Sequence, residues 1–134
     1  SPYYATAHTL AVLRELPERQ AARMRPVVAR ARTWVRQTQN AEGSWGFYGQ
    51  PTAEETSYAI LALSCGEAEN DADREADRWR CARAAAYLRA ALRPEPGDER
   101  AVFPPLWIDK CLYTPTLVVR AVVESALIAA ARRD

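Results

Sequence analysis

The chain repeats one hydrophobic pattern at an interval of about fifty residues. Segment 6–13 (Thr-Ala-His-Thr-Leu-Ala-Val-Leu) aligns with 56–63 (Thr-Ser-Tyr-Ala-Ile-Leu-Ala-Leu) and, more loosely, with 114–121. An Arg-rich segment follows the first copy, and its residues 30–39 correspond to residues 83–92 after the second. A period of this length with one helical hairpin per period predicts a repeat architecture, in which each unit buries its apolar face only against its neighbours.

Hydrophobic spacing is helical almost throughout, and no segment sustains the apolar-polar alternation of a half-buried strand. We therefore predict an all-α fold of five helices. Two are amphipathic, one at 26–39 with Pro26 in its first turn and one at 71–92, which Pro94 ends. The other three are nearly apolar and are expected to be buried on all sides, at 4–16, 53–64 and 115–131.

Composition predicts one globular domain without a membrane span. With 134 residues and 49% hydrophobic content, the chain can bury one core and has no room for a second domain. Its 18 Lys and Arg residues nearly balance 17 Asp and Glu residues, so bulk charge does not favour nucleic acid. No apolar run reaches the roughly 20 residues of a transmembrane helix. Cys65, Cys81 and Cys111 fit neither a zinc site nor a disulfide framework, so we expect reduced thiols in a cytoplasmic protein.

The segment from Arg30 to Trp45 carries a second pattern, which ends in Gln and Gly-x-Trp. The matching positions are Arg30, Ala31, Trp34, Val35, Gln39, Gly43 and Trp45. Gln39 is expected at the end of the outer helix, where unpaired carbonyls remain, and Gly43 in a tight reversal. Trp45 is expected to lie flat against the helix pair. These residues would staple neighbouring hairpins, which is a structural rather than a catalytic role.

This pattern resembles the QW repeat of squalene-hopene cyclases and related class II terpene cyclases. Further segments resemble the same family, those at 3–6, 52–59 and 103–115, and the last of them is most similar to bacterial class II diterpene cyclases. Ala5 replaces a Gly of the family pattern, and Glu54-Glu55 replaces a Ser-Gln pair. The resemblance covers nearly the whole chain and implies that residues 1–134 are the C-terminal portion of the α/α-barrel domain of such an enzyme.

The resemblance also implies an incomplete barrel. A closed α/α toroid of this family needs about six hairpins, and the repeat count gives this chain about two and a half. Apolar inner helices at both ends of such an arc would face water, and a large exposed apolar patch requires a partner. The expected partner is the remainder of the cyclase barrel or a second copy of the chain.

Class II cyclases, as the resemblance implies, protonate a polyprenyl diphosphate with the middle Asp of an Asp-x-Asp-Asp motif. The chain contains no such motif. Asp71-Ala-Asp73-Arg and Glu75-Ala-Asp77-Arg have the wrong spacing and are predicted to form an exposed helix start. The general acid is therefore expected upstream, and the chain alone is expected to be inactive. Geranylgeranyl diphosphate is the implied substrate, with Mg²⁺ bound mainly through its diphosphate and upstream residues.

Inner-helix starts face the substrate in this family, so some aromatic residues are candidates for the cavity wall: Tyr3, Tyr4, Trp107 and Tyr113. Ordinary aromatic packing is the alternative. Lys110, the only lysine, is a candidate for diphosphate binding, although a loop lysine is more often simply solvated. His8, the only histidine, is expected in the core with a hydrogen-bonded neighbour.

Two other classes of protein are alternatives to the cyclase segment. A non-catalytic α/α-toroid fragment or subunit would act through protein association, burying its open flanks in a partner. The β-subunit of a protein prenyltransferase shares the toroid but requires a zinc site of Asp, Cys and His. The single His8 is distant in sequence from each Cys, which argues against that class.

Overall fold

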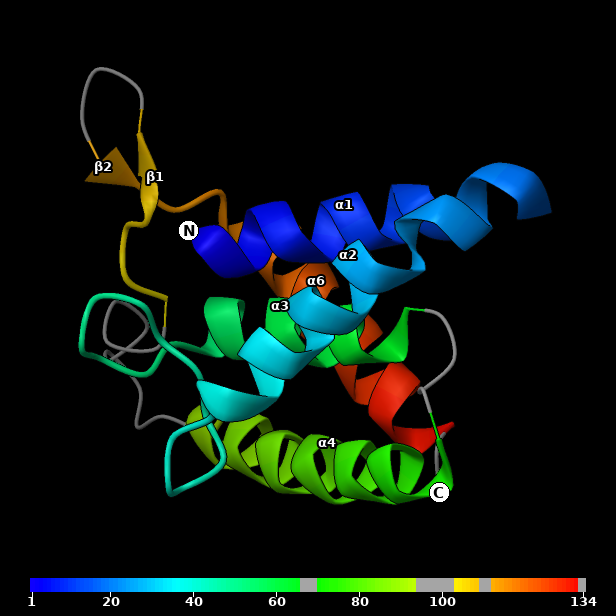
Figure 1. Ribbon diagram of the computed structural model, residues 1–134. Coiled ribbons are helices and arrows are strands. Elements are labelled where there is room, and N and C mark those ends of the chain that lie inside the picture. Colours follow the sequence, from blue (N-terminus) through cyan, green and yellow to red (C-terminus); the bar gives the residue numbers. More distant parts are fainter. Residues whose placement is uncertain (66–69, 94–102, 109–111, 133–134) are drawn as a thin grey trace.

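The computed structural model describes residues 1–65, 70–93, 103–108 and 112–132, and within them it confirms the predicted all-α fold (Figure 1). The helices are α1 (Pro2–Arg14), α2 (Glu18–Gln37), α3 (Ala53–Ser64), α4 (Asp71–Ala91) and α6 (Thr116–Ala131). Two very short strands, β1 (Trp107–Ile108) and β2 (Leu112–Tyr113), pair antiparallel with Trp107 opposite Tyr113. Lys110 and Cys111 lie outside the described residues.

The helices form two layers around α3. Helix α3 contacts α1, α2, α4 and α6, and α1 and α6 flank it on either side. Helix α2 packs on α1 and α3, and α4 packs on α3 and α6. Figure 1 shows α3 between α1 and α4, with β1 and β2 at the same end of the molecule as the N-terminus. The alternation of α1, α3 and α6 with α2 and α4 agrees with the hairpin repeat read from the sequence.

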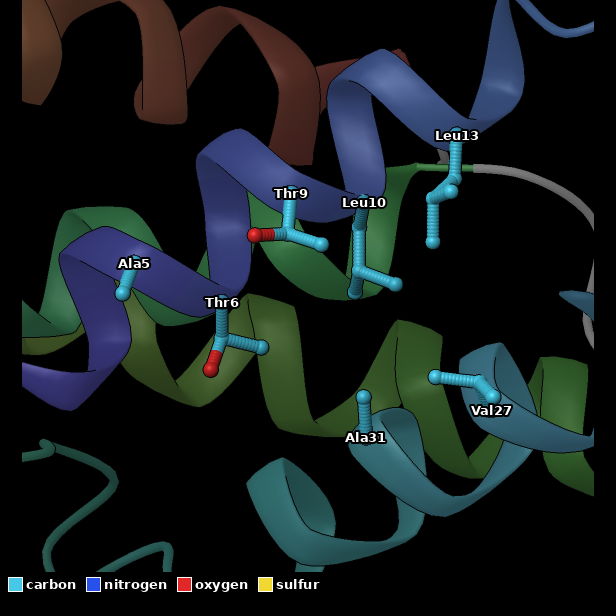
Figure 2. Close-up of a pocket in the computed structure, with 7 residues that line it drawn as sticks. All are labelled: Ala5, Thr6, Thr9, Leu10, Leu13, Val27 and Ala31. Carbon is cyan, nitrogen blue, oxygen red and sulfur yellow. The ribbon is translucent and has the colours of Figure 1, made fainter.

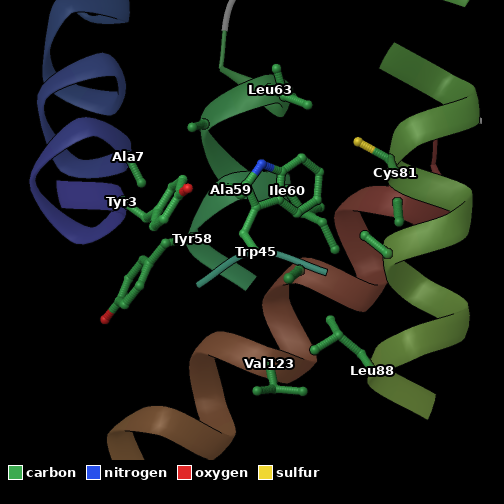
Figure 3. Packing of buried hydrophobic residues seen from close by; sticks show 14 of the residues in the cluster. Tyr3, Ala7, Trp45, Tyr58, Ala59, Ile60, Leu63, Cys81, Leu88 and Val123 are labelled. Atoms are coloured by element: carbon green, nitrogen blue, oxygen red, sulfur yellow. The ribbon is translucent and has the colours of Figure 1, made fainter. Parts of the chain in front are cut away.

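The core gathers where α3, α4 and α6 meet (Figure 3). Its fully buried large apolar side chains include Trp45, Ile60, Leu63, Leu88 and Val123. Each such side chain contributes about 2 kcal/mol through removal from water. Every residue of α3 from Ala53 to Ile60 is buried, which explains why its sequence lacks a polar face.

The prediction that all three apolar helices are buried on all sides is wrong for α1 and α6. Helix α1 buries one stripe, Tyr3, Ala7 and Leu10, and leaves Val12 66% exposed. Helix α6 likewise buries Val119, Val123, Ala126 and Ala130. Its Leu117 is 83% exposed. Among the described elements, α1 packs on α2 and α3, and α6 packs on α3 and α4, which leaves the outer stripe of each helix exposed.

Helix α2 begins eight residues before the predicted start, so Pro26 lies inside it. A proline there removes one backbone hydrogen bond, but its ring is exposed and the helix continues past it. The preceding residues favour helix by their intrinsic propensities, and Glu18 suits the first turn electrostatically. Pro26 therefore does not mark the N-terminus of α2. The residues before it lack an apolar periodicity, so the sequence pattern does not reveal that the helix begins at Glu18.

The connection from α2 to α3 is a closed loop. The Thr52 amide donates to the Trp45 carbonyl at 3.1 Å, which ties together the two ends of segment 46–51. Thr52 also caps α3, since its hydroxyl accepts from the Glu55 amide at 3.1 Å. Phe47 and Tyr48 are exposed, with their rings edge to face at 5.1 Å.

Candidate functional site

Three residues of the predicted staple join α2 to α3 and α4. The Gln39 side-chain amide donates to the Gly43 carbonyl at 2.9 Å and to the Arg80 carbonyl of α4 at 3.1 Å. Trp45 is fully buried, and its indole N–H donates to the Val35 carbonyl at 2.8 Å near the end of α2. Gly43 has φ +102°, and a β-carbon there would lie 3.0 Å from Arg83 Cβ.

The remaining staple positions, including Arg30 and Trp34, lie along α2. Arg30 is exposed, and Trp34 stacks on Tyr3 with ring centroids 4.9 Å apart. Tyr3, a candidate for the cavity wall, is only 2% exposed in this position between α1 and α2. Burial raises the pKa of its phenol, and a hydrogen bond with Thr38 opposes that rise. In the described structure Tyr3 therefore packs in the core.

A buried ionic cluster, which we call the ionic clasp, connects α2 with α4. Asp77 accepts from Arg32 Nη2 at 2.7 Å and from Arg36 Nε at 2.8 Å. Arg32 and Asp77 are both fully buried, and Arg32 Nη1 also donates to the Cys65 carbonyl at 2.6 Å. The prediction of an exposed helix start holds for Asp71 and is wrong for Asp77. Sequence spacing gave no sign of this pairing, because its partners are 45 residues apart.

A second group gathers at the first turns of α1 and α3, and we call it the aromatic-carboxyl cluster. Its members are Tyr4, His8, Glu54, Tyr58 and Trp107. The Tyr4 ring lies 4.3 Å from His8, 5.2 Å from Tyr58 and 5.4 Å from Trp107, measured between centroids. Both ring contacts to Tyr58 and Trp107 are edge to face, which is a favourable geometry for aromatic pairs.

Glu54 brings a carboxyl group into this cluster. Its Oε1 accepts from the Trp107 indole N–H at 2.7 Å, whereas Oε2 is buried and has no hydrogen-bond partner among the described residues. The residue is only 4% exposed. Burial raises the pKa of Glu54, the Trp107 hydrogen bond lowers it, and the nearby Glu55 raises it again.

The neighbouring Glu55 has the opposite environment. It is 1% exposed, and its carboxylate accepts from Ser1 Oγ at 2.6 Å, from the Phe47 amide at 3.2 Å and from Thr52 Oγ1 at 3.2 Å. Glu55 therefore ties the chain start and the closed loop to α3. The pattern of the resembled family has Ser-Gln at these two positions, and nothing in the local sequence distinguishes the two carboxylates.

The cluster also corrects the placement of His8. It was predicted in the core, but its side chain is exposed, where it contacts the Tyr4 and Tyr58 rings. Tyr58 is 2% exposed, and burial, followed by the nearby Glu54 and Tyr4, raises the pKa of its phenol strongly.

Of the predicted wall residues, the structure brings Tyr4 and Trp107 together. Tyr113 pairs with Trp107 through its backbone. One sequence feature could have identified the other members of the aromatic-carboxyl cluster, Glu54, Tyr58 and His8. In the internal repeat, Tyr4 aligns with Glu54 and His8 aligns with Tyr58. Both pairs have i, i+4 spacing, which places each pair on one face of its helix.

Metal and membrane features are absent from the described part of the chain. No group of three or more His, Cys, Asp or Glu side chains in it is placed to hold a metal ion. None of the described helices combines the length and apolarity needed to cross a bilayer.

Comparison with known proteins agrees with the sequence resemblance. The chain is 40% identical over 128 residues to labda-7,13-dienyl diphosphate synthase of Streptomyces clavuligerus, which covers 95% of this chain and 20% of that protein. It is 40% identical over 132 residues to ent-copalyl diphosphate synthase of Streptomyces sp. strain KO-3988, covering 98% and 23%. The structure of ent-copalyl diphosphate synthase from Streptomyces platensis superposes with a TM-score of 0.79 at 35% identity, covering 98% and 23%.

No family model matches the chain. The chain is nevertheless homologous, over nearly its whole length, to a segment of the bacterial class II diterpene cyclases. The copalyl diphosphate synthases are among them. The chain spans about a fifth of the length of the curated relatives it matches.

Proposed function

We propose that the chain is the C-terminal half-barrel of a class II diterpene cyclase and forms part of the wall around its substrate. The observation that carries this proposal is the match of nearly the whole chain, in sequence and in structure, to diterpene diphosphate synthases. The two-layer order of the helices supports an arc of about two and a half hairpins from an (α/α)6 barrel.

In this proposal the aromatic-carboxyl cluster faces the hydrocarbon part of geranylgeranyl diphosphate. Aromatic faces attract cations, by about 1 to 2 kcal/mol each when desolvated, so Tyr4 and Trp107 would stabilise the positive charge that moves along the cyclising chain. Tyr113 is assigned to the same wall, and Lys110 to an oxygen of the diphosphate. Tyr3 would support the wall from behind through its stacking on Trp34.

The initiating proton must then come from an Asp-x-Asp-Asp motif outside this chain, and the 134 residues alone would be inactive. Mg²⁺ would help to bind the diphosphate through ligands on the substrate and outside the described residues. The described residues hold no such ligand set, and none of the steps assigned to them depends on the metal. A cytoplasmic location completes the proposal.

The test is to incubate geranylgeranyl diphosphate with the complete gene product and, separately, with the 134-residue chain. Mass spectrometry of the dephosphorylated products should show a bicyclic diterpene alcohol from the complete protein and unchanged geranylgeraniol from the chain. Conversion by the chain alone would contradict the upstream position of the acid. Absence of a cyclic product from the complete protein would reject the cyclase assignment.

A second candidate function, protein association without catalysis, is favoured by apolar surface at both edges of the arrangement. Between α1 and α2 lies a pocket of about 190 Å³ (Figure 2), lined by Ala5, Thr6, Thr9, Leu10, Leu13, Val27 and Ala31. On the opposite edge, α6 exposes Leu117, Val118 and Ile128. The complete reading frame separates the two functions, because an upstream Asp-x-Asp-Asp favours the cyclase and its absence favours the association module.

A further inference from the structure

The free oxygen of Glu54 is the polar feature of the described structure that most requires a ligand. Glu54 is only 4% exposed, and its Oε2 has no partner among the described residues. Leaving a buried acceptor unpaired destabilises a fold, and more so when the group is charged. The adjacent Glu55 shows that this fold can satisfy a carboxylate at the same helix end. The deficit at Glu54 is therefore specific to that side chain.

The surroundings of Glu54 define the kind of ligand. Trp107 holds Oε1 through its indole N–H, and its ring also contacts the Tyr4 ring. Tyr58 lies one turn along α3 from Glu54, on the same face of the helix. A carboxylate among aromatic rings suits an apolar cation, because the rings stabilise the charge and the buried carboxylate can accept a proton.

We propose that Glu54 is the proton acceptor that ends the cyclisation, a role that rests on the proposed cyclase function. The C–H bond next to the final cationic carbon breaks, and its electron pair forms the new C=C bond. The proton passes to Oε2 and gives a neutral carboxylic acid, which afterwards releases the proton to water. The Trp107 indole N–H fixes the carboxylate orientation by holding Oε1, which leaves Oε2 to face the substrate.

The test uses the complete cyclase with Glu54→Gln, which keeps the shape of the side chain and removes its basicity. Loss of a general base lowers the rate by about 10²-fold or more, so formation of the native alkene should fall by that factor. The residual turnover should give alkene isomers or an alcohol from capture of the cation by water. Glu54→Asp should retain the native alkene at a lower rate. A merely structural role would not change the identity of the product.

Glu55→Gln is the matched control, because it alters an equally buried carboxylate at the same helix end. It should keep the product spectrum of the wild type, whatever its stability. An unchanged product spectrum and rate in Glu54→Gln would overturn the proposal for Glu54 while the cyclase assignment stands. A wild-type protein that forms no cyclic product would instead reject the cyclase assignment.

Trp107→Phe gives an independent readout that does not depend on the folding of the Glu54 variants. It keeps an aromatic ring and removes the hydrogen bond that lowers the pKa of Glu54, so activity should be lost at a higher pH on the acid side. The other groups near Glu54 are Glu55 and Tyr58 of α3, with Tyr4 and His8 of α1 in contact with the Tyr58 ring. They are unchanged in this variant. An acid limb that does not move would overturn the proposal.

Discussion

The ionic clasp and the aromatic-carboxyl cluster differ in how fully the hydrogen bonds of a buried carboxylate are satisfied. In the clasp, both oxygens of Asp77 accept hydrogen bonds from guanidinium groups of α2. In the cluster, Glu54 has one oxygen bonded and one without a partner among the described residues. A saturated carboxylate serves the fold, whereas an unsaturated one reduces stability and keeps an oxygen available for a ligand. The following variants test this contrast in the 134-residue chain.

The largest effect is expected from Asp77→Ala in the clasp. The substitution removes the carboxylate that neutralises Arg32, a fully buried residue. Breaking a buried ion pair by removing one partner costs about 4 kcal/mol of the free energy of unfolding. Urea denaturation followed by circular dichroism measures the loss. Asp71→Ala is the control, since its pair with Arg74 is exposed and should contribute less than about 0.5 kcal/mol.

The next effect concerns the glycine that lets the staple approach α4. Gly43→Ala places a β-carbon 3.0 Å from Arg83 Cβ and 3.1 Å from the Arg83 backbone, at a φ of +102°. The combined strain and overlap should cost about 3 kcal/mol. Gly49→Ala is matched in having a positive φ, +76°, but meets no atom within 4 Å, so its loss should be about 1 kcal/mol. Equal losses in the two variants would show that the contact with α4 is unimportant.

Substitution of the two neighbouring glutamates should have different effects on stability. Glu55→Gln weakens charge-assisted hydrogen bonds and should cost about 1 to 2 kcal/mol. Glu54→Gln should leave stability unchanged or raise it near neutral pH, because it removes a buried charge that has only one partner. A clear destabilisation by Glu54→Gln would show that this carboxylate serves the fold after all.

The Glu54 effect should depend on pH. The folded state raises the pKa of this carboxyl, so it holds the proton more tightly than the unfolded state does. Wild-type stability at this site is therefore retained below the unfolded pKa and is lost as the pH rises through the folded pKa. The advantage of Glu54→Gln in melting temperature should grow as the pH rises from about 4 to about 7. A difference that is constant over this range would contradict the raised pKa.

The smallest change in stability is expected at the open edge. Leu117 is 83% exposed, so Leu117→Ser should change the free energy of unfolding by about 0.5 kcal/mol or less. If this edge associates with a second copy, the variant should be more monomeric in sedimentation velocity experiments. Val119→Ser, two residues further along α6 in the buried stripe, is the contrasting variant and should unfold the chain instead.

The bounds of two helices could be predicted from the sequence, because they depend on residues at the helix ends themselves. Helix α3 was predicted with its observed bounds, because Thr52 caps it and its apolar run stops at Ser64. Helix α4 was predicted to within one residue for similar reasons. The start of α2 was missed because Pro26 is a strong local signal that the packing of the whole helix overrides.

The site could be predicted less well, because it depends on contacts between distant segments. Tyr4 and Trp107 were expected on one wall, and the structure does place them side by side. The bond from Trp107 to Glu54 joins residues 53 positions apart and has no sequence pattern. Glu55 accepts from three donors and Glu54 from one, because different neighbouring segments, the closed loop and β1, supply those donors. Adjacent glutamates therefore looked equivalent in the sequence.

The closed loop between α2 and α3 offers a place to attach a probe. The backbone hydrogen bond between Thr52 and Trp45 closes segment 46–51 at its base, and space is open around Gly49. Insertions are best tolerated at exposed loop tips whose ends are fixed. A fluorophore or affinity tag inserted next to Gly49 would therefore report on substrate binding or assembly from outside, without changing the register of either helix.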